Sequence, residues 1–477
     1  MTKGSPFRGL GQKLFLLLHL LMNHLLNDDT IVALSTPPGV GAIGVIRLSG
    51  PKAISITEKI MPGITLETAA THTLHFGIVK DRNTVLDEAV VGLFKAPNSF
   101  TREDVTEISC HGSPYILQKV LQLILSKGAR LAKPGEFTMK AFLNGRFDLS
   151  QAEAVSDLIA SETEAAHHLA MNQMRGGFSN ELKTLREELM NFASLIELEL
   201  DFSEEDVEFA NRAQLLALLD KIEKKISALC ESFRLGNVLK NGVSTVIAGR
   251  PNAGKSTLLN ALLNEERAIV SEIPGTTRDT IEETLIINGI AFRMTDTAGI
   301  RQATDIIEKK GVERTMQKIE QAAIVMYLFD LENMTLPEVL EDIKSLKKDE
   351  STPILPVANK VDTGNYADTF KSIDGLIFIS AKNGKGIADL KKQLYEKALQ
   401  GRNISEGVIL SNARHYEALQ ATLKNLQAAQ KGIEKKLSGE LVASDIRSAL
   451  NHLGEITGEV TTDDLLGNIF GKFCIGK

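Results

Sequence analysis

Residues Val243–Thr257 read VSTVIAGRPNAGKST, and this stretch decides the fold of the chain around it. The β-branched run Val243–Ala248 predicts a strand, and the apolar residues of Thr257–Leu263 predict a helix. Between them, Gly249–Ser256 matches the pattern G-x-x-x-x-G-K-[ST]. A glycine loop in this position presents backbone N–H groups and a helix N-terminus to an anion. The stretch therefore predicts a nucleoside triphosphate site, with the lysine at the outer phosphates and the serine on Mg²⁺.

Downstream of this loop, strand and helix patterns alternate along the sequence. Repeated β–α units of this kind predict a mostly parallel sheet covered by helices on both faces. The expected strands are Thr284–Ile287, Ala291–Thr295, Ala323–Phe329, Ile354–Ala358 and Leu376–Ile379, and the expected helices are Glu308–Gln321, Leu336–Leu346 and Ile387–Leu399.

Four further motifs follow the phosphate loop in a fixed order, and together they identify the base as guanine. Gly275–Asp279 offers a threonine hydroxyl to Mg²⁺, and Asp296–Gly299 (DTAG) offers a carboxylate to its hydration shell. In Asn359–Asp362 (NKVD) a carboxylate can accept from the ring N–H and the amine of guanine, and a buried Asp362 would reject adenine. Ser380–Lys382 (SAK) adds a backbone amide for the guanine oxygen. The sequence therefore predicts a GTP-binding domain.

The residue after Gly299 carries information about hydrolysis. Ras-type GTPases have a water-orienting Gln at this position, and here it is Ile300, which cannot orient water. The sequence also has no obvious arginine finger. A monovalent cation could replace that charge, because Asn252 and the carbonyls of Ser271–Thr276 are hard oxygen ligands. A role for Asn252 in shaping the loop is equally open.

The rest of the chain divides into a mixed α+β part and helical parts. We expect an α+β domain at 27–144 and one discontinuous helical domain made of 145–240 and 403–477, with an α/β domain inserted into it at 241–402. In the first domain the expected strands are Thr73–Val79, Val85–Lys95 and Val105–Cys110, and the expected helices are Pro51–Ile60 and Ser113–Lys127. In the helical parts the expected helices are Gln151–Arg175, Asn180–Glu199, Ala213–Leu235 and the helical region 411–451.

Composition narrows the class of protein. The 477 residues carry a net charge of −7, which argues against a broad surface that coats nucleic acid. The three cysteines lie far apart without a CxxC pair, so we expect a reducing cytoplasm and no disulfide framework.

Residues 1–26 contain the apolar run Leu14–Met22, which is too short to span a bilayer and is not followed by a signal-peptide cleavage site. We interpret 1–26 as a non-native extension, with Met22 as a candidate start, and the alternative is a helix that touches a membrane. We interpret the acidic stretch 197–206 as a solvated face rather than a metal site.

The motifs resemble those of the MnmE (TrmE) family of tRNA-modification GTPases. The resemblance covers nearly the whole chain from Asp29, and its most specific parts are KPGEFTMKAFLNGRFDLSQAEA and the terminal Cys474-Ile475-Gly476-Lys477. It implies GTP hydrolysis coupled to (carboxymethyl)aminomethyl modification at C5 of the wobble uridine of certain tRNAs. It further implies a cytoplasmic homodimer that works with the FAD-dependent partner MnmG (GidA), as a heterotetramer or larger complex, on a tRNA substrate.

The resemblance also implies roles for individual residues of the GTP site. Glu308 matches the glutamate that orients the attacking water, Ser256 and Thr277 match ligands of Mg²⁺, and Asn252, Ser271, Ile273 and Thr276 match ligands of K⁺. The full set expected to contact GTP is Asn252, Ala253, Gly254, Lys255, Ser256, Thr257, Ser271, Thr276, Thr277, Asp296, Thr297, Ala298, Gly299, Asn359, Lys360, Asp362, Ser380, Ala381 and Lys382.

A second site is implied in the N-terminal domain, for a tetrahydrofolate derivative in its 5,10-methylene or 5-formyl form. The matching residues are Arg47, Glu107, Arg146 and Lys477, although family members commonly have Lys where this chain has Arg146. Cys474 is either a nucleophile or a buried tail residue near the folate. Without the resemblance, Glu107 would be a surface charge on a strand at the edge of the sheet.

Two other functions stay open at the level of sequence. One is a ribosome-assembly GTPase that binds rRNA, but no GxxG loop beside a basic face follows the GTP-binding domain. The other is a non-enzymatic GTP-dependent switch, which Ile300 would fit but Glu308 and Asn252 would not.

Overall fold

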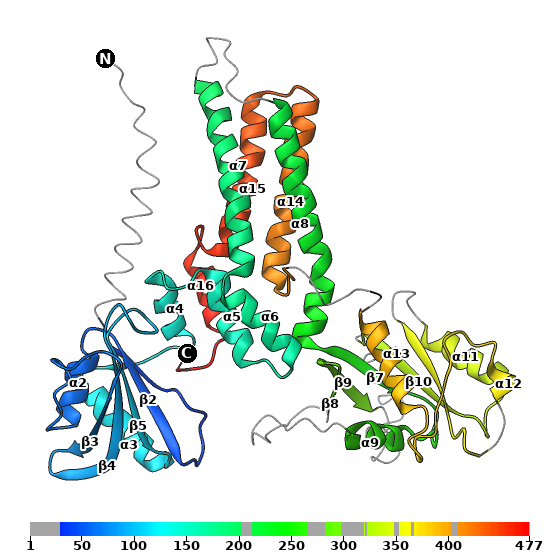
Figure 1. The fold of residues 1–477 in the computed structure, drawn as a ribbon, viewed down its shortest axis with the longest axis horizontal. Coiled ribbons are helices and arrows are strands. Elements are labelled where there is room, and N and C mark those ends of the chain that lie inside the picture. Colours follow the sequence, from blue (N-terminus) through cyan, green and yellow to red (C-terminus); the bar gives the residue numbers. More distant parts are fainter. Residues whose placement is uncertain are drawn as a thin grey trace, which may run out of the picture. The chain divides into compact units, whose positions relative to one another are not determined.

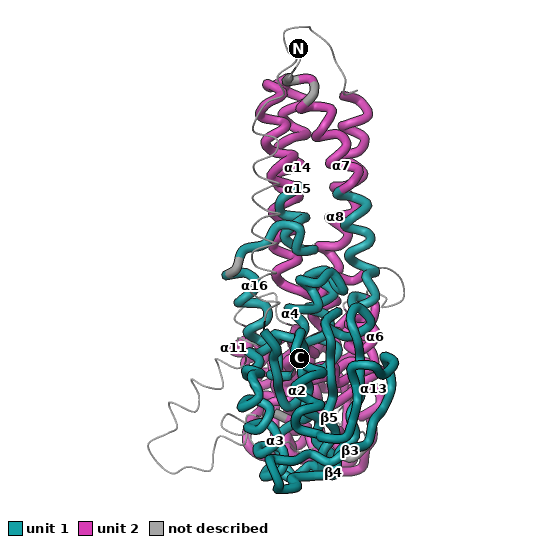
Figure 2. Tube along the Cα trace, turned by 90° about the vertical axis from the view of Figure 1, so that its left-hand side faces the viewer, with its two compact units in different colours: residues 1–159, 173–186, 450–477 teal, residues 160–172, 187–449 magenta. Residues whose placement is uncertain are grey.

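The structure is a computed structural model and describes residues 29–201, 212–265, 282–296, 319, 322–347, 353–363, 367–399, 401 and 408–476. The chain forms two compact units (Figure 2). The first contains Met1–Ile159, Gln173–Arg186 and Leu450–Lys477, and the second contains Ala160–Asn172 and Glu187–Ala449. Because these units group residues by contact, the domain boundaries expected at 144, 240 and 402 stay predictions.

The first unit is built on a six-stranded sheet, in the order β3-β4-β5-β2-β1-β6 (Figure 1). Its strands pair antiparallel, except for β1 with β6, which are parallel. The bounds are β1 (Ile31–Leu34), β2 (Ile43–Ser49), β3 (Thr73–Asp81), β4 (Thr84–Phe94), β5 (Val105–His111) and β6 (Arg130–Leu131). This confirms the predicted α+β class, and the ends of β3, β4 and β5 lie within two residues of the expected ones.

The two faces of this sheet differ in burial. Helices α2 (Ala53–Ile60) and α3 (Pro114–Ser126) pack against the sheet and share one apolar core with it. On the other face, Leu74 and Phe76 of β3 are 76% and 66% exposed. Strand side chains alternate between faces, so one apolar row is buried while the next lies at the surface.

The rest of the first unit brings the C-terminal tail to the N-terminal sheet. Helices α4 (Glu136–Leu143), α5 (Leu149–Ile159) and α16 (Asp463–Phe470) share an apolar cluster. Beyond α16 the chain approaches β1 so closely that a Cβ on Gly476 would lie 2.5 Å from the carbonyl oxygen of Leu34. Neither α4 nor α16 was expected from the sequence as a separate helix.

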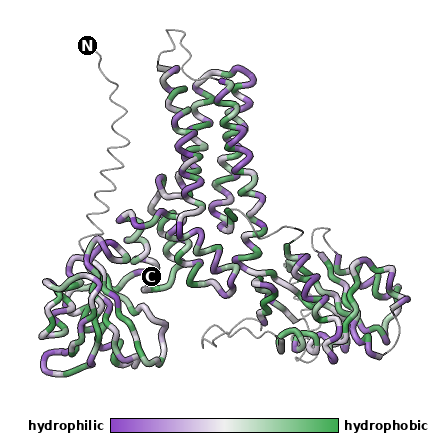
Figure 3. The backbone as a smooth tube through the Cα atoms, in the orientation of Figure 1, coloured by the Kyte–Doolittle hydropathy of each residue, from purple (hydrophilic) through white to green (hydrophobic). Residues whose placement is uncertain are grey.

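Four long helices are α7 (Gly177–Asp201), α8 (Arg212–Asn241), α14 (Ala413–Glu434) and α15 (Gly439–Thr457). Hydrophobic and hydrophilic residues alternate along each of them, as expected for helices that bury one stripe (Figure 3). The described helices include none with the length and apolar character needed to cross a membrane. The described residues also hold no His, Cys, Asp and Glu cluster suited to a metal ion.

Two segments that were each predicted as one continuous helical stretch are divided into two helices in the structure. The expected helix Gln151–Arg175 is interrupted between α5 and α6 (Glu164–Met174), where the hydroxyl of Thr163 accepts from the N–H of Ala166. This is the pattern of an N-cap, which starts a new helix. The region 411–451 is interrupted after α14, close to Lys436, whose φ of 55° is left-handed.

The second unit also contains a sheet, in the order β12-β11-β10-β7-β9-β8. Only the β8–β9 pair is antiparallel, and β10 is buried along its whole length, so the predicted mostly parallel α/β sheet is confirmed. The strands are β7 (Val243–Ala248), β8 (Glu282–Ile287), β9 (Ile290–Asp296), β10 (Ile324–Asp330), β11 (Ile354–Asn359) and β12 (Ile377–Phe378); the helices are α9 (Lys255–Glu265), α11 (Leu336–Leu346), α12 (Ala367–Phe370) and α13 (Ile387–Leu399).

Helix α8 passes directly into this sheet. Only Gly242, with φ of 75°, separates Asn241 from β7, and a Cβ there would lie 2.6 Å from the carbonyl oxygen of Ala291. Leu235 and Leu239 of α8 belong to the same apolar core as the strands. The end of the helix and the sheet therefore form one packed body.

Candidate functional site

The phosphate loop lies at the carboxyl end of β7, and α9 begins at Lys255. Two of its residues can only be glycine. A Cβ on Gly249 would lie 2.1 Å from the carbonyl oxygen of Leu328, and one on Gly254 would lie 2.3 Å from Nδ2 of Asn359. Asn252 between them has a left-handed φ of 63°. This backbone gives the loop the form that the sequence pattern predicts.

The lysine of the pattern is folded over the loop. Nζ of Lys255 donates to the carbonyl oxygens of Gly249 and Arg250 at 2.9 and 3.0 Å. The side chain is only 9% exposed, which makes an anion a favourable neighbour for the ammonium group. Ser256 and Thr257, in the first turn of α9, are exposed on the same helix N-terminus.

Asn359 joins three of the predicted motifs. Its Nδ2 donates to the carbonyl oxygen of Ala253 at 2.8 Å, and its Oδ1 accepts from the N–H of Ala381 at 3.0 Å. The residue is 3% exposed, so both hydrogen bonds are shielded from water. The phosphate loop, the NKVD motif and the SAK motif, which are far apart in sequence, therefore lie together.

Lys360, the next residue, has a partner that the sequence did not reveal. Its Nζ lies 2.5 Å from Oδ2 of Asp330, which also accepts from Nδ2 of Asn333 at 2.8 Å. Burial opposes ionisation of Asp330, but the hydrogen bond from Lys360 outweighs it and lowers the pKa of the carboxyl. The sequence signal that could have pointed to Asp330 as a partner is its position, because it is the charged residue that ends a completely buried strand.

The expectation that Asp362 is buried is wrong, because the side chain is exposed. It lies in the turn beyond β11 rather than on the strand, where solvent reaches it. A hydrogen bond from the Ser380 side chain is the largest cause that lowers the pKa of Asp362, and Nδ2 of Asn383 donates to it at 3.1 Å. The carboxylate is therefore ionised and held in place, as an acceptor of two guanine N–H groups must be.

The other predicted GTP-site residues are only partly within the described chain. Asp296 ends β9, and its Cα is paired with Ile247 of β7, directly before the phosphate loop. The side chain of Asp296 is outside the described part, and Lys382 is exposed beside Ala381. Ser271, Ile273, Thr276, Thr277, Thr297, Ala298, Gly299 and Glu308 lie outside the described residues, as does Lys477 of the second site.

The second site starts from an ion pair in the middle of the first sheet. Arg47 on β2 and Glu107 on β5 are register partners, and both Nε and Nη2 of Arg47 lie 2.8 Å from Oε1 of Glu107. Because β5 lies between β4 and β2, Glu107 is not on an edge strand. Nη1 of Arg47 also donates to the carbonyl oxygen of Gly476 at 3.4 Å, so the C-terminal tail completes this pair.

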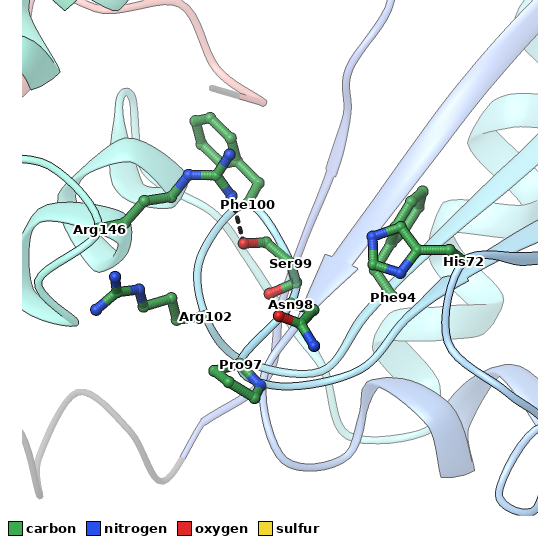
Figure 4. A pocket seen from close by; sticks show the side chains of 8 residues that line it. All are labelled: His72, Phe94, Pro97, Asn98, Ser99, Phe100, Arg102 and Arg146. Carbon is green, nitrogen blue, oxygen red and sulfur yellow. Dashed lines mark hydrogen bonds between the residues drawn. The ribbon is translucent and has the colours of Figure 1, made fainter. Parts of the chain in front are cut away.

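Phe100 links this ion pair to Arg146. The guanidinium carbons of Arg47 and Arg146 lie 5.6 and 5.2 Å from the centre of the Phe100 ring. Arg146 also donates to the carbonyl oxygen of Ser99 (Figure 4). Three of the four predicted folate residues are described, and the structure brings them together around this ring. The sequence did not reveal Phe100, because a cation–π contact leaves no pattern along the chain.

A hollow of about 560 Å³ opens beside Arg146. Its lining comes from the segment after β4, the residue before β3 and the segment after α4 (Figure 4). The lining residues are His72, Phe94, Pro97, Asn98, Ser99, Phe100, Arg102 and Arg146.

Cys474 lies on the tail that reaches the second site. The reading of Cys474 as a buried residue is wrong, since the residue is exposed while its neighbours Phe473 and Gly476 are buried. Its carbonyl oxygen accepts from the N–H of Gly135 at 3.4 Å, which holds the tail against the start of α4. The tail is therefore held in place while the Cys474 side chain is left at the surface.

Comparisons with known proteins identify the family of the chain. Residues 149–474 match the MnmE helical domain, and residues 30–146 match the N-terminus of the GTP-binding protein TrmE. The tRNA modification GTPase MnmE of Cytophaga hutchinsonii is 57% identical over 453 residues, which cover 94% of this chain and 98% of that protein. MnmE of Flavobacterium johnsoniae is 53% identical over 466 residues, covering 95% of this chain and 100% of that protein. The helical-domain match covers more than half of the chain, and both relatives are more than 50% identical to it over nearly their whole length. The chain therefore belongs to the MnmE (TrmE) family of tRNA modification GTPases.

Proposed function

We propose that this chain hydrolyses GTP to drive C5 (carboxymethyl)aminomethyl modification of the wobble uridine of certain tRNAs. The observation that carries the GTPase half is Asn359, which ties the phosphate loop to the SAK motif. The relatives named as tRNA modification GTPases support the tRNA half. An FAD-dependent partner of the MnmG (GidA) type would complete the reaction, and the free state of all three cysteines agrees with a cytoplasmic location.

Mass analysis of wobble uridines tests the tRNA half of the proposal. In tRNA from cells that lack this chain, the uridines at C5 are expected to carry neither aminomethyl nor carboxymethylaminomethyl groups. A plasmid copy of the chain should restore both. Full modification in the deletion strain would contradict the proposal, and so would deletion cells that accumulate unprocessed rRNA while keeping modified uridines.

Mg²⁺ and K⁺ are part of the proposed reaction. Ser256 is exposed in the first turn of α9, where a hydroxyl can reach a phosphate-bound Mg²⁺, and Thr277 would be the second protein ligand. Asn252 is exposed in the loop on a left-handed backbone, and its side-chain amide oxygen is the proposed K⁺ ligand. Together with Ser271, Ile273 and Thr276 it would hold K⁺, whose charge would act where other GTPases use an arginine.

Hydrolysis by the purified chain is therefore expected to depend on the monovalent cation. In KCl the rate of phosphate release should exceed that in NaCl by about 10-fold or more, because the ion supplies charge stabilisation in the transition state. The two salts are compared at equal ionic strength and saturating GTP. Equal rates in KCl and NaCl would remove K⁺ from the proposal but leave GTP hydrolysis intact.

A tetrahydrofolate derivative, in its 5,10-methylene or 5-formyl form, is the proposed ligand of the second site. The residues fit it, because Glu107 can accept from the amine and ring N–H of a pterin, and Arg47 holds that carboxylate in place. Arg146 and Phe100 would line the site next to it, with Lys477 at the end of the tail. A bound folate would supply the one-carbon unit, and Cys474 is a candidate nucleophile.

A homodimer is also part of the proposal. The outer face of the first sheet carries exposed apolar side chains at Leu74, Phe76 and Val90, on neighbouring strands β3 and β4. Contiguous apolar surface of this kind is typical of protein interfaces. Sedimentation of the chain as a monomer at micromolar concentration would contradict the dimer.

A further inference from the structure

Two arginines of the hollow beside Arg146 lie close together. Arg146 and Arg102 both line it, and the charge of Arg102, after burial, is the second cause that lowers the pKa of Arg146. Figure 4 shows both on one side of the hollow, with His72 and Phe94 on the other. The hollow therefore concentrates positive charge between aromatic walls.

Neither arginine contacts a carboxylate within the described part of the chain. Nη1 of Arg102 donates to the carbonyl oxygen of Asn144 at 3.0 Å, and Nη1 of Arg146 donates to that of Ser99. The nearby acids have other partners: Glu103 accepts from Lys140 at 2.8 Å, and Asp104 accepts from the N–H of Ala96 at 2.9 Å. Each guanidinium has five N–H donors, so carbonyl contacts leave donors for an anion.

The backbone conformation at two lining residues also supports a ligand site. Arg102 and His72 have left-handed φ values of 60° and 63°, a conformation that glycine adopts most easily. Residues held in such conformations cluster at ligand-binding sites, so their position beside a hollow is the informative part. Here two such residues line the same hollow.

The hollow shares Phe100 and Arg146 with the proposed folate site. Phe100 lines the hollow, and its ring is shared by Arg47 of the Glu107 ion pair and by Arg146. Phe100 therefore lies between the Glu107 ion pair and the hollow, where an elongated ligand would contact it. Folates carry their two carboxylates on a glutamyl tail at the end opposite the pterin.

We propose that this hollow binds the carboxylates of the folate glutamyl tail, with Arg102 as the residue that recognises them. The inference rests on the proposed folate site and names the part of the ligand that Arg102 contacts. Bidentate pairing with a carboxylate suits the planar guanidinium fork. A nucleic-acid phosphate is the less favoured occupant, because phosphate-binding surfaces use many cations in a row and the chain is acidic overall.

The test compares two probes, 5-formyl-tetrahydrofolate and 5-formyl-tetrahydropteroate, which lacks the glutamyl tail. Their affinities for the full chain are measured by calorimetry. The chain should bind the first more tightly, and Arg102→Gln should weaken binding of that probe by about 5- to 10-fold while the tail-less probe keeps its affinity, since only one exposed charged contact is removed. Arg102→Lys, which keeps the charge but loses the fork, should lie between the two.

Arg82→Gln is the matched control. Arg82 is also an exposed arginine on left-handed backbone, with φ of 54°, but it lies in the turn between β3 and β4, away from the hollow. Its variant should bind both probes as the original chain does. Thermal unfolding of all variants shows whether a change in affinity reflects folding.

Four outcomes would overturn the inference. If the original chain binds both probes equally, the tail is not recognised, although the folate site stands. If Arg102→Gln weakens both probes equally, Arg102 acts on the pterin half or on the fold. If it weakens tRNA binding and spares both probes, the hollow binds phosphate. If the original chain binds neither probe, the proposed folate function itself fails.

Discussion

Asp362→Asn is expected to move base preference from guanine to xanthine. The carboxamide replaces one acceptor with a donor, which faces an N–H of guanine but a carbonyl oxygen of xanthine. Sites built around such hydrogen bonds discriminate by orders of magnitude, so the Kd for GTP should rise by about 100-fold while that for xanthosine triphosphate falls. Because Asp362 is exposed and held by Ser380 and Asn383, the substitution should leave the fold intact.

Fluorescence titration with labelled GTP and xanthosine triphosphate measures both affinities. Asp374→Asn is the matched control, since Asp374 is another exposed aspartate of the same region and belongs to none of the five motifs. It should change neither Kd. Unaltered GTP affinity in Asp362→Asn would show that the NKVD carboxylate does not recognise the base.

Glu308→Ala is expected to slow GTP hydrolysis by about 10²- to 10⁴-fold, the usual contribution of a residue that positions or activates the nucleophile. The reason lies at Ile300, which occupies the position of the water-orienting glutamine and has no polar atom. Glu308 would orient the attacking water in place of that glutamine. Loss of the Glu308 carboxylate should leave GTP affinity nearly intact, because the carboxylate would contact the water rather than the nucleotide.

Single-turnover phosphate release in KCl, together with the Kd for a non-hydrolysable GTP analogue, separates the two effects. Glu341→Ala on α11 serves as the control, because Glu341 is an exposed glutamate outside the motifs. Full turnover by Glu308→Ala would require another group to orient the water. A large loss of GTP affinity would instead make Glu308 a binding residue.

Sequence predicted the elements whose ends carry local signals. Helix α11 has the expected bounds, Leu336–Leu346, because Thr335 and Glu338 form a capping box at its start. The glycines of the phosphate loop were predicted for the same reason, since the loop can only be built with them. Both signals lie within a few residues of the structure that they specify.

The parts that sequence did not reveal depend on distant contacts. Arg47 and Glu107 were expected at one site only through family resemblance, because strand pairing brings them together from 60 residues apart. The tail carbonyl of Gly476 comes from 429 residues beyond Arg47. Asp362 was expected inside the protein because its chemistry requires a fixed acceptor. The structure fixes it by hydrogen bonds from neighbours instead of burial.

The direct connection through Gly242 couples α8 rigidly to the GTP-binding sheet, so that the helix can act as a lever. The helix has 30 residues, which at 1.5 Å per residue gives an arm of about 45 Å. Because Leu235 and Leu239 are packed into the core of the sheet, the helix has no free hinge there and must follow any tilt of β7. A tilt of about 10° at the phosphate loop therefore displaces the far end of an arm of this length by about 8 Å. A small tilt beside the phosphate loop would thus be magnified into a displacement of about the distance between the axes of two packed helices, roughly 8–10 Å.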